Sequence, residues 1–223
     1  FNLANFFERR IEMITVLLIL IAYVLGSIPN ALWVGKTFKN IDVREHGSKN
    51  TGSTNAARVL GAKLGIFTLI LDILKGALPT YLGIVLGADL LTRMTGIDKL
   101  DVIVIGMAAI LGHTFSLFLK FKGGKAVATT LGVFLVLVPY AILILLVIFF
   151  VIFGLTRYVS LASIISAVVL PIAVYFTTRH IPLTVLGIII GLLVIIRHKE
   201  NIKRLINGTE SKLSFSKDKK DKK

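Results

Sequence analysis

Three short polar stretches carry the residues that could do chemistry, and the first suits an anion. Residues 42–61 read DVREHGSKNTGSTNAARVLG, where Gly47 and Gly52 allow a tight turn. Arg58 follows a set of hydroxyl and amide side chains, those of Ser48, Asn50, Thr54 and Asn55. Backbone N–H groups, hydroxyls and one guanidinium together suit a phosphate group. An ordinary polar loop would have a similar composition, and no GxGxxG or P-loop pattern is present to decide between them.

The second stretch, KFKGGKAVATT at residues 120–130, enters a hydrophobic run directly after Lys125. Gly123 and Gly124 would expose backbone amides at the N-terminus of a helix, where the helix dipole and a lysine also favour an anion. Basic residues commonly flank a membrane span, which accounts for the other two lysines. Such a flank does not require two glycines, so we assign Gly123, Gly124 and Lys125 to a phosphate site.

The third stretch reads RHKEN at residues 197–201. In a continuous helix Arg197 and Asn201 would share one face, with His198 next to Asn201. Basic residues after a final span are a usual topology signal, but His and Asn add little to that signal. We therefore expect His198 and Asn201 to orient a small ligand. Ser160, in the segment RYVSLASI, would either pack between helices or line the same polar site, and we favour the site.

Several chemistries are excluded by what the chain lacks. It has no Cys, and its four His show no metal-ligand spacing, no Ser/His/Asp triad and no His-x4-Asp pattern. We expect no metal and no cofactor. Within the apolar stretches, Asp72 and Lys75 lie three residues apart and would pair as either a stabilising or a functional pair. His113 is interpreted as a hydrogen-bonded packing residue.

A membrane bundle has to position these stretches, because 55% of the 223 residues are hydrophobic and only 17% are charged. The net charge of +14 indicates anionic partners such as lipid headgroups or phosphates, and the apolar composition argues against nucleic acid. Seven stretches approach the roughly 20 apolar residues of a transmembrane helix. They are residues 13–34, 64–86, 102–118, 126–138, 141–154, 160–176 and 182–196. Pro139 favours two helices over one within 126–154, and six spans are the alternative.

Basic residues divide unevenly between the two sides of this bundle. With seven spans, the loops on one side hold 20 Lys and Arg, and those on the other side hold 5. Cytoplasmic flanks carry the excess of Lys and Arg. We therefore predict an all-α, polytopic integral membrane protein with its N-terminus outside and its C-terminus in the cytoplasm.

The chain divides into one long functional unit and two short ends. Residues 1–12 are interpreted as a leader remnant or a segment foreign to the natural chain, and residues 13–210 as one transmembrane catalytic domain. Residues 211–223 form a basic tail too polar to bury a core, which we expect to be disordered.

The motifs of this sequence resemble those of a known family. The segments that carry the resemblance are GSIPNALWVGK, DVREHGSKNTGSTNAARVLG, LDILKG, LGHTFSLFLKFKGGKAVAT, RYVSLASI and RHKENIKRLINGTE. In this order they resemble the bacterial membrane acyl-phosphate:glycerol-3-phosphate acyltransferase family, over about residues 25–210. The chain departs from the family at Lys49 and Ala126, where glycine is usual, and at Ser53, where Ala is frequent.

The resemblance implies a seven-helix enzyme of phospholipid biosynthesis in the bacterial cytoplasmic (inner) membrane. Such an enzyme moves a fatty acyl group from acyl phosphate to the 1-hydroxyl of sn-glycerol 3-phosphate, giving lysophosphatidic acid and phosphate. The active site would face the cytoplasm, and an acyl-phosphate-producing enzyme would be a partner. Carried over by motif, Ser48, Thr54, Asn55, Arg58 and Lys125 would hold phosphate, with Gly123 and Gly124 shaping the cradle; His198 and Asn201 would position glycerol phosphate, and Ser160 would line the pocket.

A transporter or channel for a small phosphorylated anion is the alternative function. Basic, glycine-rich loops at a membrane mouth would suit it as well. It predicts a polar path through the bilayer, however, and the polar groups of this chain crowd one side instead.

Overall fold

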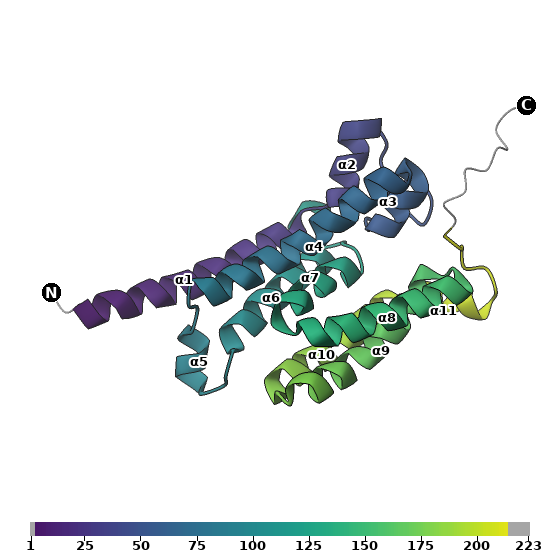
Figure 1. The fold of residues 1–223 in the computed structure, drawn as a ribbon. Helices are drawn as coiled ribbons and strands as arrows, with labels where there is room; N and C mark the ends of the chain where they lie inside the picture. Colours follow the sequence, from purple (N-terminus) through teal and green to yellow (C-terminus); the bar gives the residue numbers. More distant parts are fainter. Residues whose placement is uncertain (1–2, 214–223) are drawn as a thin grey trace, which may run out of the picture.

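A computed structural model describes the backbone of residues 3–213 and the side chains of residues 13–213, and this part of the chain is helical throughout. Figure 1 shows the helices as a bundle of long rods with short helices at their ends. Their bounds are α1 Leu3–Ser27, α2 Asn30–Lys39, α3 Ser53–Leu60, α4 Ala62–Val85, α5 Leu90–Thr95, α6 Leu100–Thr114, η1 (a 3-10 turn) Leu117–Leu119, α7 Val127–Leu137, α8 Pro139–Thr156, α9 Val159–Thr178, α10 Ile181–Arg197 and α11 Lys199–Ile206.

Within residues 3–213, four elements are long and apolar enough to cross a membrane, and the number rises to six if each of two bent helix pairs counts as one crossing. The four are α4, α6 with its following 3-10 turn, α8 and α9. The 11 residues of α7 are apolar but extend only about 16 Å, roughly half of the hydrocarbon core. The expected all-helical membrane fold is confirmed, and the count of seven crossings stays a prediction.

The first expected span is not one continuous helix. Residues 13–34 were expected to cross together, but α1 ends at Ser27 and α2 begins at Asn30 with a bend of 47°. Pro29 lies between them as the residue before α2. Proline has no N–H and disfavours a helical conformation in the residue before it, so the helix cannot run through Ile28. Lys75 Nζ instead donates to the Ile28 carbonyl at 2.9 Å.

The expected turn at Pro139 is confirmed. α7 ends at Leu137, Val138 has an extended φ of −146°, and Pro139 is the first residue of α8. Proline suits the first position of a helix because its missing N–H would have no partner there. The hydrophobic run 126–154 is therefore two helices.

Close helix packing relies on glycines at two crossings. α1 packs along α6 and α4 packs along α7 (Figure 1). At the first crossing a Cβ on Gly26 or Gly112 would overlap the opposite backbone, and at the second the same holds for Gly76 and Gly132. Small residues of this kind let transmembrane helices approach closely. α8, α9 and α10 pack against one another and share their core with α6 and α7.

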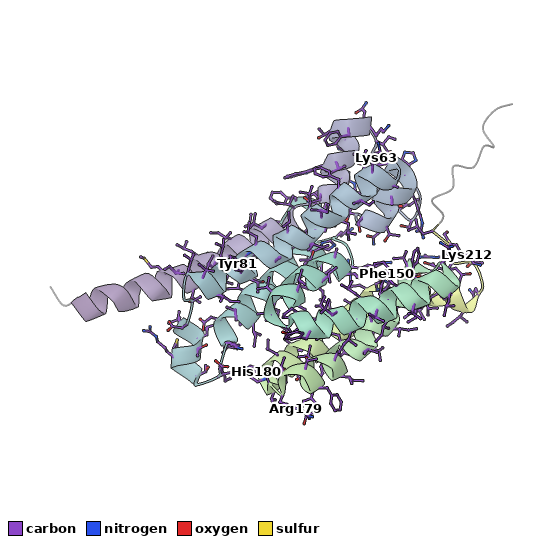
Figure 2. All side chains as sticks on the ribbon, in the orientation of Figure 1. Lys63, Tyr81, Phe150, Arg179, His180 and Lys212 are labelled. Carbon is purple, nitrogen blue, oxygen red and sulfur yellow. The ribbon has the colours of Figure 1, made fainter. Side chains whose placement is uncertain are left out.

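The two ends of the bundle differ in structure. Figure 2 shows Lys63 and Lys212 at the end that carries α3 and the C-terminal segment, and Arg179 and His180 at the opposite end. The segment after α11 folds back, so that Leu213 N–H donates to the Arg157 carbonyl at 3.0 Å. Of the expected tail, residues 214–223 lie outside the described residues, as do residues 1–2 of the expected leader. The helix α1 begins within that leader.

Candidate active site

One cavity of about 440 Å³ gathers most of the residues singled out from the sequence. It is lined by residues of α3, α4 and α6 to α11, by the loop before α3, and by Glu210 and Leu213 of the C-terminal segment. Nine of the eleven candidate residues line it, and they are Ser48, Asn50, Thr54, Asn55, Arg58, Lys125, Ser160, His198 and Asn201. Residues from three separate stretches thus meet at a single site.

A chain of hydrogen bonds joins the polar groups of this cavity. The Lys125 ammonium donates to Asn201 Oδ1, and Asn201 Nδ2 donates to Glu210 Oε1 at 2.7 Å. Ser160 Oγ donates to the same carboxylate oxygen at 2.7 Å, and Arg204 Nε donates to Oε2 at 2.7 Å. Because Glu210 accepts from the Asn201 amide, Asn201 must turn its oxygen toward Lys125, which fixes the lysine in the cavity.

The surroundings of these hydrogen-bonded groups shift the pKa values of Lys125 and Glu210. Burial, the largest influence, lowers the pKa of Lys125 to about 8, and the nearby Glu210 carboxylate acts in the opposite direction. Burial would raise the pKa of Glu210, but the hydrogen bonds from Ser160, Asn201 and Arg204 lower it below its usual value. Lys125 is therefore a cation that the protein holds at some energetic cost near pH 7, ready for an anionic partner.

Arg58 lines the same cavity and forms no salt bridge within the part of the chain that the structure describes. Its Nη2 donates to the carbonyl of Ser211 at 2.8 Å, while its Nε is buried and has no partner among the described residues. Burial lowers the pKa of Arg58, although a guanidinium stays charged at any physiological pH. A partly buried guanidinium with a free N–H suits an anionic ligand.

The polar stretch 42–61 is half loop and half helix, because α3 occupies its second half. Asn55, expected to contact phosphate, is instead used to shape the loop. Its Oδ1 accepts from Ser48 N–H at 2.8 Å, and its Nδ2 donates to the carbonyls of Val43, His46 and Asn50. All of its polar atoms are engaged in this way, so Asn55 positions the loop that carries Ser48.

The two glycines do not provide free amides, which corrects the sequence-based expectation. Gly123 N–H donates to the Thr114 carbonyl and Gly124 N–H to the His113 carbonyl, each at 3.0 Å. Neither glycine lines the cavity. They are needed for close packing, since a Cβ on Gly123 would overlap the His113 carbonyl and one on Gly124 would overlap the imidazole of His113.

Arg197 and Asn201 were expected to share a helix face, but the helix bends by 58° between α10 and α11. Arg197 points to the glycine loop, where Nε donates to the Gly124 carbonyl at 3.2 Å and Nη2 to the Gly123 carbonyl at 2.7 Å. Asn201 points to Lys125. The bend lets one short stretch hold both the loop and the lysine that follows it.

His198, at the bend, is buried and has a defined tautomer. Its Nδ1 lies 2.7 Å from the Val194 carbonyl, which can only accept, so the proton is on Nδ1. Nε2 is then a hydrogen-bond acceptor on a side chain that lines the cavity.

Comparison with known proteins decides the family. Residues 16–208 match the family model for glycerol-3-phosphate acyltransferase. The chain is 50% identical over 197 residues to the glycerol-3-phosphate acyltransferase of Fusobacterium nucleatum, which covers 88% of this chain and 97% of that protein. It is 44% identical over 209 residues to the enzyme of Enterococcus faecalis, with 90% and 92% covered. The chain belongs to the glycerol-3-phosphate acyltransferase family.

Two solved structures have the same fold as this acyltransferase. Both are of PlsY (YgiH), an integral membrane glycerol 3-phosphate acyltransferase. The glycerol 3-phosphate form has a TM-score of 0.80 at 37% identity, and the lysophosphatidic acid form 0.78 at 36% identity. Each match covers 90% of this chain and 96% of the other. The resemblance inferred from the motifs is confirmed, and the chain is a multi-pass membrane enzyme.

At two positions where the family usually has glycine, this acyltransferase has another residue. Lys49 and Ala126 adopt left-handed backbone conformations, with φ of +57° and +59°. Glycine reaches this region at no steric cost, whereas a residue with a Cβ is strained there. Both residues thus adopt a backbone conformation that glycine takes at no steric cost.

Reasoning from the sequence missed three ionisable residues that line the acyltransferase cavity. Glu210 organises the polar end, and its signal was that it is the one acidic residue within the otherwise basic or neutral segment 201–216. Asp72 and His113 also line the cavity, although they had been interpreted as a pair and a packing residue within the membrane. Their spacing in the sequence gives no sign that α4 and α6 bring them to one wall.

Proposed function

We propose that this enzyme transfers a fatty acyl group from an acyl phosphate to the 1-hydroxyl of sn-glycerol 3-phosphate. The products are lysophosphatidic acid and inorganic phosphate. The observation that carries the proposal is the mixed lining of the cavity. The basic groups of Arg58 and Lys125 line it together with apolar side chains of α4 and α8, namely Ile66, Leu69, Leu145, Leu146, Phe149 and Phe153. A molecule with a phosphate head and an acyl chain fits such a cavity.

An acyl phosphate as donor agrees with the chemistry of the side chains. It is a mixed anhydride with phosphate as its leaving group, so it needs charge neutralisation and alignment more than activation. The chain has no Cys to carry an acyl group. Arg58 and Lys125 supply the positive charge for two phosphate-bearing substrates, whereas a thioester donor would not require a second phosphate site.

The proposed reaction is one direct displacement. The oxygen of the 1-hydroxyl forms a bond to the acyl carbon, and the bond between the acyl carbon and the phosphate oxygen breaks. An oxygen of the departing phosphate takes the hydroxyl proton. His198 Nε2, which is free to accept a hydrogen bond, orients the hydroxyl without removing its proton. Ser48, Thr54 and Ser160 contact the phosphate-bearing parts of the two substrates.

A donor comparison tests this function. Purified enzyme in liposomes receives glycerol 3-phosphate together with either palmitoyl phosphate or palmitoyl-coenzyme A. We expect lysophosphatidic acid to form with palmitoyl phosphate as the donor and not with palmitoyl-coenzyme A. Formation from the thioester at an equal rate would overturn the donor assignment while leaving the acceptor intact.

We further propose that the chain crosses the membrane seven times with its polar cavity on the cytoplasmic side. The uneven division of Lys and Arg supports this orientation. The chain has no Cys, so single cysteines can be placed at Lys63 and Arg179, which lie at opposite ends of the molecule (Figure 2). A membrane-impermeant maleimide added to intact cells should label position 179 and spare position 63. The reverse pattern would invert the assigned orientation.

A further inference from the structure

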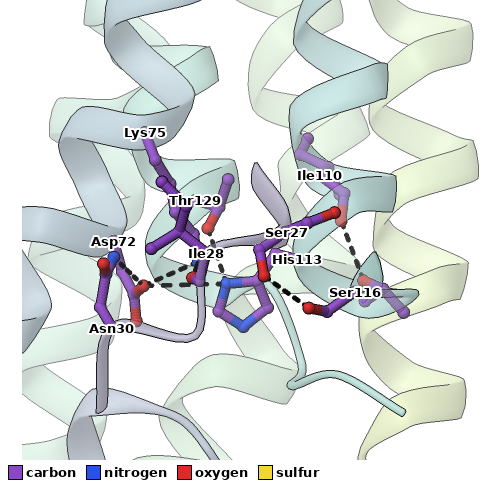
Figure 3. A network of polar contacts seen from close by, with 10 residues as sticks. Ser27, Ile28, Asn30, Asp72, Lys75, Ile110, His113, Ser116 and Thr129 are labelled. Atoms are coloured by element: carbon purple, nitrogen blue, oxygen red, sulfur yellow. Dashed lines mark hydrogen bonds and ion pairs between the residues drawn. The ribbon is translucent and has the colours of Figure 1, made fainter. Parts of the chain in front are cut away.

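A polar network lies where α4, α6 and α7 meet, and it places His113 on the cavity wall. Figure 3 shows Asp72 beside Asn30, Lys75 and His113. Asp72 Oδ1 accepts from Asn30 Nδ2 and from Lys75 Nζ, each at 2.9 Å. His113 is 6% exposed, and its side chain lines the same cavity as Lys125.

The partners of His113 Nδ1 decide which nitrogen carries the proton. Thr129 Oγ1 lies 3.0 Å from Nδ1, and within residues 13–213 this contact is the hydrogen bond available to the Thr129 hydroxyl. Thr129 is fully buried, so its hydroxyl proton must go to Nδ1 to avoid being unpaired. Asp72 Oδ1 is 3.9 Å from Nδ1, too far to accept a proton from it. His113 is therefore neutral with its proton on Nε2.

The Nε2 proton is the free donor of this network. The Nδ1 edge of the ring faces Thr129 and Asp72, and the Nε2 edge lies against Gly124, where a Cβ would overlap it. No acceptor within the described residues takes this proton. Gly124 directly precedes Lys125, and the His113 side chain lines the same cavity as Lys125.

This location matches a requirement of the proposed reaction. An acyl phosphate bound with its phosphate at Lys125 and its chain along the apolar side chains of the cavity has its carbonyl between the two. The carbonyl oxygen gains negative charge when the hydroxyl attacks, and a fixed neutral donor there stabilises that charge. We propose that His113 is a catalytic residue whose Nε2–H donates to the acyl carbonyl oxygen, and that Thr129 is the positioning residue that fixes its tautomer. This inference rests on the proposed acyl transfer.

Two substitutions of Thr129 distinguish a catalytic role from a packing role, because the two roles predict opposite orders of kcat for the two variants. Thr129→Val keeps the volume and removes the hydroxyl, so Nδ1 loses its donor and the proton can move to it. Thr129→Ser keeps the hydroxyl and removes a methyl group. We expect kcat with palmitoyl phosphate to fall about 100-fold or more in Thr129→Val, as for loss of one oxyanion donor. Thr129→Ser should stay within about tenfold of wild type.

Substitutions of His113 provide the matching pair. His113→Gln offers an amide N–H near the position of Nε2, and His113→Leu offers none. We expect His113→Leu to lose about 100- to 1,000-fold in kcat with little change in KM, and His113→Gln to recover at least tenfold of that loss. Imidazole ¹⁵N chemical shifts of wild-type enzyme labelled at histidine should report a protonated Nε2 for His113. This measurement uses the wild-type enzyme, so it does not depend on whether a variant folds.

The outcomes separate the two proposals. If wild-type enzyme does not acylate glycerol 3-phosphate from palmitoyl phosphate, the proposed function fails. If wild type is active but Thr129→Val is as active as Thr129→Ser or more so, the residue only packs and the inference is overturned. A wild-type imidazole protonated on Nδ1, or a His113→Leu enzyme with unchanged kcat, would overturn it as well.

Discussion

Lys125 and Asn201 are 76 residues apart in the chain and are joined by a hydrogen bond from the lysine ammonium to the Asn201 side-chain oxygen. This contact connects the glycine loop before α7 to the helix that follows the bend at His198. Glu210 accepts from the other side of the same amide, so one carboxylate orients both. The polar end of the cavity is therefore assembled from distant segments that depend on one another.

Activity should depend on the charge of Lys125. Its pKa is lowered to about 8 by burial, so the cation is present below that pH and is lost as the pH rises through it. We expect kcat/KM for palmitoyl phosphate, which reports the free enzyme, to fall above about pH 8. Lys125→Arg keeps a cation at all these pH values and should move the fall to higher pH. If the fall in kcat/KM at alkaline pH is unchanged in that variant, Lys125 is not its cause.

Replacing His198 tests which group takes the proton of the 1-hydroxyl. His198→Gln keeps a hydrogen-bonding group and lacks imidazole basicity. If a phosphate oxygen accepts the hydroxyl proton, the variant should retain about a tenth or more of wild-type kcat. A loss of about 1,000-fold, typical for removal of a general base, would instead assign the proton to His198. Steady-state rates at saturating palmitoyl phosphate distinguish the two.

A methyl group at Gly124 should disable the enzyme. The added Cβ of Gly124→Ala would overlap the imidazole of His113, so either the ring or the loop carrying Lys125 must move. We expect kcat to drop by about 100-fold, since a displacement near 1 Å has this effect on reactions that depend on alignment. Gly154→Ala is the matched control, because a Cβ there meets no atom within 4 Å. Equal activity of the two variants would show that the loop tolerates the displacement.

Ala126 offers a stabilising substitution. Its φ of +59° is strained for any residue with a Cβ, and Ala126→Gly relieves the strain. We expect a gain of about 1 kcal/mol in unfolding free energy, seen as a higher midpoint of thermal unfolding in detergent. Ala108→Gly, in the middle of α6, should have the opposite effect because glycine weakens an ordinary helix. A lower midpoint for Ala126→Gly would contradict the strain.

Much of this architecture follows from the sequence alone. Apolar runs located most helices, and Pro139 correctly separated α7 from α8. Pro29 also indicates a break between two helices, but the run on both sides of it is apolar enough that one continuous span was expected. The short helix α3 was missed because Ser, Thr and Asn also suit turns, and only its packing against α4 favours a helix there.

The residues singled out from the sequence mostly meet at one cavity, whereas their hydrogen bonds were not predicted. The motifs brought Arg58, Lys125, His198 and Asn201 to one cavity, as the structure has them. The use of each polar atom depends on partners far away in the chain, which spacing does not reveal. Asn55 shapes a loop and the Gly124 amide is paired with the His113 carbonyl for this reason.

The most direct test is phosphate release from purified enzyme given palmitoyl phosphate, with and without glycerol 3-phosphate, beside Arg58→Ala. In the structure Arg58 lines the cavity and donates to the Ser211 carbonyl, and its buried Nε has no partner among the described residues. We predict release that requires glycerol 3-phosphate and falls by at least about 100-fold in the variant, with its thermal unfolding unchanged. Palmitoyl phosphate that stays intact with folded wild-type enzyme, or release that ignores the acceptor, would contradict acyl transfer from an acyl phosphate.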